Sequence, residues 1–94
     1  MKHYELVMIF SPESSEEDVN TTIERVTRTV AEEGGVFIEK ESWGVRRLAH
    51  PVRGAKEGNF MSAHVSMEPG AVNKIEKTMT AAPGLVRHLL LKKN

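Results

Sequence analysis

The chain has 94 residues, 39% of them hydrophobic and 28% charged, and its formal net charge at neutral pH is zero. This size and balance predict one globular domain over residues 1–94 and leave little room for a second core. No apolar run reaches the ~18 residues of a membrane helix, so we expect an intracellular protein. The absence of cysteine excludes disulfides, thiolate metal sites and cysteine nucleophiles.

The charges are distributed unevenly along the chain. Residues 11–41 carry nine acidic and three basic side chains, whereas residues 42–94 carry three acidic and nine basic ones. Such asymmetry is typical of a protein with one anion-binding side. Chance clustering of charges on solvated faces gives the same pattern and stays an alternative.

The first half of the chain predicts a strand, a helix and a second strand. Residues 2–10 alternate, with apolar side chains at every even position from residue 4 to residue 10. Apolar residues then recur at helical spacing over residues 15–33, after serine caps and an acidic first turn, and Gly34-Gly35 is a helix-end signal. The second strand opens at residues 36–38, bends at Trp43-Gly44 and ends near Pro51, which favours an edge strand.

The second half predicts a hairpin, a helix and a last strand. Residues 53–58 are polar and contain glycine, as hairpin loops do, and residues 59–67 alternate as a third strand. A second helix begins near Pro69 and has an apolar stripe formed by Val72, Ile75 and Met79. Residues 85–91 form the fourth strand, and residues 92–94 are expected to be a short basic tail.

The resulting order β-α-β-β-α-β predicts an α+β, ferredoxin-like fold: a four-stranded antiparallel sheet with two helices on one face. The other face is then open. Strand alternation assigns to it the apolar side chains of Val7, Ile9, Phe60, Leu89 and Leu91, with His3, Glu5, His64 and Arg87 among them. An apolar patch of this kind favours a protein partner, because base stacking needs more exposed aromatic rings than one phenylalanine. The alternative is a slip in strand parity that returns some of these residues to the core.

The most distinctive segment runs from Trp43 to Val52 and contains two adjacent arginines. Adjacent residues of a strand point to opposite faces, so Arg46 and Arg47 need not share a target. Guanidinium groups bind phosphates with two parallel hydrogen bonds, and lysines add point charges. Together with Arg53, Lys56, Arg87, Lys2, Lys92 and Lys93, they are predicted to line one end or edge of the sheet. Any single arginine can equally be a surface residue without a dedicated partner.

The segment from Trp43 to Val52 resembles the signature of the bacterial ribosomal small-subunit protein six family. The opening Lys2-His3-Tyr4-Glu5, followed by an apolar strand and Pro12, is similar as well. So is the spacing through Gly34, Gly44, Pro51, Gly58 and Arg87, and the resemblance covers essentially the whole chain. It implies a non-catalytic structural constituent of the small ribosomal subunit, in the cytoplasm, without cofactor, metal, membrane or small-molecule substrate.

The resemblance also implies two partners: the central domain of small-subunit ribosomal RNA and ribosomal small-subunit protein eighteen, which would cover part of the sheet. The residues interpreted as RNA-binding are Lys2, His3, Tyr4, Arg46, Arg47, His50, Arg53, Lys56, Arg87 and Lys92. Those interpreted as partner-binding are Val7, Ile9, Phe60, His64, Leu89 and Leu91.

Other classes of protein stay open. A homodimeric regulatory or ligand-sensing domain of the same fold would dimerise through the apolar sheet face. An RNA-recognition module needs paired aromatics on its third strand, where residues 58–61 supply one. Enzymatic signals are weak: there is no nucleophile-elbow pattern, and no helical metal-ligand spacing occurs among the four histidines, His3, His50, His64 and His88.

Overall fold

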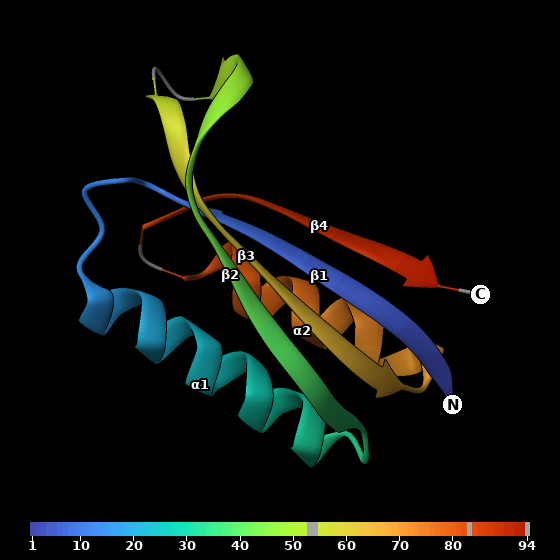
Figure 1. Cartoon of the computed structure of the whole chain (residues 1–94). Helices are drawn as coiled ribbons and strands as arrows, with labels where there is room; N and C mark the ends of the chain where they lie inside the picture. The colour runs from blue at the N-terminus through green and yellow to red at the C-terminus, as the bar shows by residue number, and fades with distance from the viewer. Residues whose placement is uncertain (53–54, 83, 94) are drawn as a thin grey trace.

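Four strands and two helices account for most of the chain. The computed structural model describes residues 1–52, 55–82 and 84–93. The elements are β1 (Lys2–Phe10), α1 (Glu16–Glu32), β2 (Val36–Val52), β3 (Ala55–Met67), a 3-10 turn (Pro69–Ala71), α2 (Val72–Thr80) and β4 (Leu85–Lys93). The strands form one antiparallel sheet in the order β2-β3-β1-β4, and both helices lie on the same face of it (Figure 1). The predicted ferredoxin-like fold is confirmed.

The core lies between the helices and the sheet. The helix-facing side chains of the central strand β1 are all buried: Tyr4, Leu6, Met8 and Phe10. The helices contribute the predicted stripes, with Val26 and Val30 from α1 and Ile75 and Met79 from α2. Burial of one such side chain stabilises the fold by about 1.5–3 kcal/mol. Packing therefore holds α1 in place despite its four threonines, which are poor helix formers.

The helix α1 begins and ends within one residue of its predicted bounds, because local sequence signals fix both ends. The Ser15 hydroxyl accepts a hydrogen bond from the Asp18 backbone N–H at 3.0 Å, which caps the acidic first turn. After the helix, Gly34 has φ +78°, and the Gly35 N–H donates to the Val30 carbonyl at 2.8 Å. A Cβ on Gly35 would lie 2.7 Å from the Ser66 carbonyl oxygen, so the turn into β2 needs glycine there.

Two predicted boundaries were wrong. The loop expected over residues 53–58 is shorter, because β3 already begins at Ala55 and pairs with the end of β2. The expected basic tail is part of β4: Lys92 pairs with Tyr4 and Lys93 with His3. In both places the local sequence is polar, but a neighbouring strand supplies partners for the backbone groups and extends the ladder.

The strands β2 and β3 continue beyond the other two strands as a hairpin, here called the arm (residues 46–52 and 55–58). The last residue of β1, Phe10, pairs with Asn59, so β3 has no partner from β1 beyond that point. Figure 1 shows the arm rising above the four-stranded part of the sheet. The exposed side chains of Arg46, Arg47, His50 and Lys56 therefore lie away from the helices and the core.

Candidate functional site

The arm presents several of the predicted RNA-binding side chains to solvent. Arg46 and Arg47 follow each other in β2, and they, His50 and Lys56 are all exposed. The register pairs Arg46 with Gly58 and Arg47 with Glu57, so the two arginines face opposite sides of the hairpin, as predicted. Within the described ranges, the four form no salt bridge. Arg53 falls outside the described residues.

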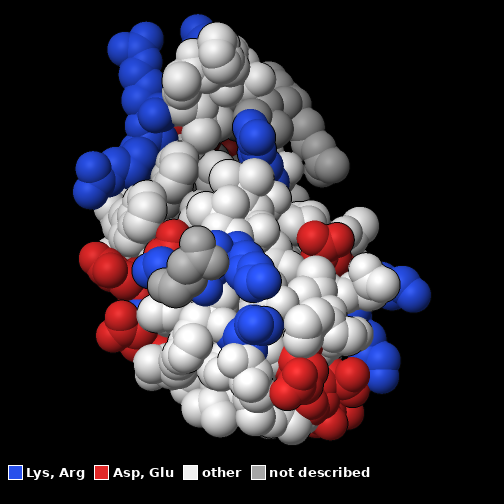
Figure 2. Space-filling view, turned by 90° about the vertical axis from the view of Figure 1, so that its right-hand side faces the viewer, with Lys and Arg blue, Asp and Glu red and all other residues white. Residues whose placement is uncertain are grey.

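The other predicted RNA-binding residues do not join the arm. Lys2, His3 and Lys92 lie at the start of β1 and the end of β4, which meet because these strands are antiparallel. His3 and Ile9 are six positions apart in β1, or roughly 20 Å. Figure 2 likewise shows basic side chains both at the top of the molecule, where the arm lies, and in its middle. The expectation of one basic end or edge was therefore wrong.

Two of the predicted RNA-binding residues lie elsewhere: Tyr4 in the core and Arg87 near the base of the arm. Tyr4 is 6% exposed and belongs to the core, so its prediction as an RNA contact was wrong: its parity on β1 is that of the helix-facing residues. Arg87 instead pairs with Ile9 near the base of the arm. The structure thus brings Arg87 closer to the arm than Lys2, His3 or Lys92.

The open face is the side of the sheet that the helices leave uncovered. Its cross-strand rows are Glu39–His64–Glu5–Leu91, Glu41–Ser62–Val7–Leu89 and Gly44–Phe60–Ile9–Arg87. All six predicted partner-binding residues lie on it. The side chains change along the sheet. The first row carries two glutamates, the second carries Val7 and Leu89 beside Glu41, and the third carries Arg87 near the arm.

The apolar part of the open face is less exposed than the alternation predicted. Leu89 and Leu91 are 38% and 48% exposed, but Val7 and Ile9 face the same side and are buried. They lie on the central strand β1, with the side chains of β3 and β4 on both sides. The expectation that all five apolar residues project into solvent was therefore wrong for these two.

Trp43 is 40% exposed. Its ring lies parallel to that of Phe60, with ring centroids 6.1 Å apart and an angle of 5° between the planes. The pairing register shifts between Ser42 and Gly44, and Gly44 has φ +77°, so a bulge places the indole over β3. The predicted bend at Trp43-Gly44 was the available signal, but alternation alone could not give the ring's direction.

An acidic hollow of about 180 Å³ lies on the open face between β1, β2 and β3. Glu5, Glu39, Glu41 and His64 line it, together with Lys93, whose ammonium is 3.6 Å from a Glu5 carboxylate oxygen. Nε2 of His64 is buried and has no hydrogen-bond partner in the described part of the chain. Three carboxylates against one lysine make the hollow attractive to a cation and repulsive to a phosphate.

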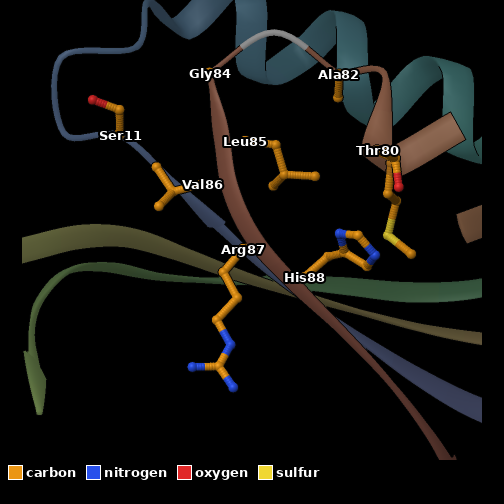
Figure 3. Close-up of a pocket in the computed structure, with 9 residues that line it drawn as sticks. Ser11, Thr80, Ala82, Gly84, Leu85, Val86, Arg87 and His88 are labelled. Carbon is orange, nitrogen blue, oxygen red and sulfur yellow. The ribbon is translucent and has the colours of Figure 1, made fainter. Parts of the chain in front are cut away.

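A second hollow, of about 420 Å³, lies between the end of α2 and the start of β4. Figure 3 shows Leu85 and His88 on one side of β4 and Arg87 pointing away to the other. Its described lining includes no carboxylate that could work with His88 as an acid–base pair. Among the described residues, no three histidines or carboxylates converge on a metal position, and no helix is long and apolar enough to span a membrane.

Fold and site together define a ferredoxin-like protein that offers two surfaces for assembly, a basic arm and an uncovered sheet face. Comparison with known families makes the assignment specific. The model of the family described as ribosomal protein S6 matches residues 3–92, and the chain belongs to this family. It is accordingly a structural protein of the small ribosomal subunit, a cytoplasmic particle in bacteria.

Relatives and solved structures agree with this assignment. The chain is 32% identical over 92 residues to the small ribosomal subunit protein bS6 of Desulforamulus reducens, covering 98% of this chain and 97% of the relative. It is 26% identical over 94 residues to bS6 of Desulforudis audaxviator, covering both chains fully. The crystal structure of 30S ribosomal protein S6 from Thermotoga maritima superposes with a TM-score of 0.88 at 22% identity, covering 98% of this chain and 87% of that one.

The same fold occurs in a protein of another name. The C-terminal domain of the MgtC protein from Mycobacterium tuberculosis has a TM-score of 0.71 at 9% identity, covering 99% of this chain and 88% of that one. One fold can host many functions, so the fold alone does not determine the function. The family match, rather than the architecture, carries the assignment of this chain.

Proposed function

We propose that this protein binds small-subunit ribosomal RNA through the arm and docks ribosomal small-subunit protein eighteen on the open face. The chain acts as one domain in this role, and its work is to hold local RNA geometry during assembly. It does so by binding the folded RNA better than the unfolded ensemble. The observation that carries the proposal is the arm, which holds Arg46 and Arg47 clear of the body.

The chemistry of the arm supports RNA as its partner. Arg46, Arg47 and Lys56 are exposed cations on a hairpin, and only one acid, Glu57, lies among the described residues of the arm. Arginine binds phosphate oxygens with paired hydrogen bonds, and the guanidinium keeps its charge at any physiological pH. Arg87, beside the base of the arm, extends the same positive surface onto β4.

The chemistry of the open face supports a protein with basic side chains as its partner. Leu89 and Leu91 supply exposed apolar area, and the acidic hollow lies next to them in the same cross-strand rows. RNA phosphates would be repelled by Glu39 and Glu41, whereas lysine or arginine side chains of a protein would be attracted. This surface therefore fits a basic ribosomal protein better than it fits RNA.

The RNA proposal is tested by the salt dependence of binding. Each phosphate contact contributes about 0.7–0.9 to the slope of log affinity against log salt concentration. Arg46→Ala with Arg47→Ala should lower the affinity for the central-domain RNA and reduce the slope by about 1–2. The matched control is Arg25→Ala with Arg28→Ala, which removes the same charge from exposed positions of α1 on the far side of the sheet. A slope that falls equally in both variants would remove the arm from the RNA interface.

The protein partner is tested by measuring RNA affinity with and without protein eighteen. We expect weak binding by the isolated protein and stronger binding by the pair. Equal affinities would contradict this coupling. Sedimentation of the pure protein tests the alternative: a stable homodimer that is unaffected by protein eighteen would favour a dimeric regulatory domain instead.

A further inference from the structure

Trp43 is a large apolar side chain that the fold leaves exposed beside a second aromatic ring. The Phe60 ring lies parallel to the indole, with ring centroids 6.1 Å apart. The indole remains 40% exposed, although tryptophan gains more from burial than almost any other residue. The bulge at Gly44 presents this ring at the base of the arm.

A cation is tied to the backbone of Trp43. The Arg46 Nε–H donates a hydrogen bond to the Trp43 carbonyl oxygen at 3.1 Å, which holds the guanidinium at the turn that carries the indole. This bond uses one of the five N–H donors of arginine. The residue opposite Arg46 on β3 is Gly58, so no side chain from that position covers the guanidinium. Arg46 is exposed, so a phosphate can reach it.

We infer that Trp43 is a stacking platform for an unpaired RNA base and that Arg46 binds the adjoining phosphate. The inference rests on the proposed function and deepens it, because it assigns a base contact to an RNA surface otherwise made of phosphate contacts. An exposed aromatic face beside an arginine is the usual means of binding single-stranded RNA. Every base has a π-face, so a contact made by stacking tolerates any base.

The charges around Trp43 favour one path for the bound RNA. Glu41 precedes Trp43 by two residues in β2 and points to the open face, in the row of Ser62. A phosphate on that side would meet the acidic hollow. On the other side of Trp43, β2 continues with Arg46 and Arg47 into the arm. The RNA strand therefore leaves the stacked base toward the arm and away from the protein-binding part of the open face.

The experiment uses Trp43 as its own reporter, because it is the only tryptophan of the chain. The full protein is titrated at low salt with an unstructured RNA hexamer and with an abasic hexamer of equal charge. We expect the base-bearing hexamer to quench the Trp43 emission and to bind at least about five-fold more tightly than the abasic one. Trp43→Leu, measured with end-labelled RNA, should bring both hexamers to the affinity of the abasic one, and Trp43→Phe should restore part of the difference.

The matched control is Val36→Ala, an exposed apolar residue at the far end of the same strand. It should leave the preference for the base-bearing hexamer unchanged. Equal affinities of the wild-type protein for both hexamers would overturn the stacking inference and leave phosphate binding by the arm intact. Weakened binding of protein eighteen by Trp43→Leu, with unchanged RNA preference, would also overturn it by assigning the ring to the protein interface. Absence of binding by either hexamer at low salt would also overturn the stacking inference, whereas the proposed function would stand or fall with the salt slope of the Arg46→Ala, Arg47→Ala variant on central-domain RNA.

Discussion

Leu6 and Leu89 lie on opposite faces of one sheet, and only Leu6 is shielded by the helices. Leu6 on β1 is fully buried, whereas Leu89 on β4 is 38% exposed. The two residues are chemically identical, so their environments alone separate a core position from an exposed one.

Substitution of the two leucines by alanine should therefore give different results. Leu6→Ala should lower the free energy of unfolding by about 2–5 kcal/mol, because it leaves a cavity in the core. Leu89→Ala should lower it by no more than about 1 kcal/mol and should weaken the binding of protein eighteen. Urea unfolding and a binding titration measure the two effects. Similar stability losses would mean that the open face is already covered within this chain.

Gly44 is expected to be necessary for its backbone conformation rather than for space. A Cβ at Gly44 would meet no described atom within 4 Å, but its φ of +77° disfavours any L-residue. Gly44→Ala should cost about 1–2 kcal/mol of stability. Gly70→Ala is the control, since Gly70 has equal space and no such φ. Thermal unfolding of both variants measures the two stability losses. An equal loss in both would show that the left-handed conformation of Gly44 is not the cause.

The Ser15 cap should contribute measurably to stability. Its hydroxyl accepts the Asp18 N–H, one of the N-terminal donors of α1 that lack a partner within the helix. Ser15→Ala should cost about 1 kcal/mol, whereas Ser15→Asp should preserve the cap and the favourable charge. Chemical denaturation with circular dichroism provides the measurement. No loss in Ser15→Ala would show that the Asp18 N–H finds another acceptor.

The acidic hollow should matter for the protein partner and not for RNA. Glu39→Gln with Glu41→Gln should weaken the binding of protein eighteen on the order of ten-fold at low salt, and by less at high salt. Binding of RNA by the isolated protein should not weaken, because no phosphate contact is lost. The control is Glu24→Gln with Glu32→Gln, which removes the same two charges from exposed positions of α1. A loss of RNA affinity in the Glu39 and Glu41 variant would contradict the division of the two surfaces.

The sequence by itself determined the element order, the core face of β1, the ends of α1 and the family. These depend on local chemistry: alternation of apolar residues, a serine cap, a glycine pair at a helix end, and a contiguous motif around Arg46 and Arg47. Each of these signals lies within a few consecutive residues, so no knowledge of distant contacts was needed. The family resemblance also came from a contiguous segment, residues 43–52.

Only the tertiary structure decided which of the candidate residues lie together and which are exposed. Cross-strand pairing extends β3 and β4, places Lys2 and Lys92 far from the arm, and buries Val7 and Ile9. The bulge beside Gly44 decides that the Trp43 ring lies over Phe60. Register and bulges depend on hydrogen bonds between strands that are distant in the chain, and a shift of one residue moves a side chain to the other face. No local pattern contains that information, and for this reason the exposed aromatic pair emerged only from the folded chain.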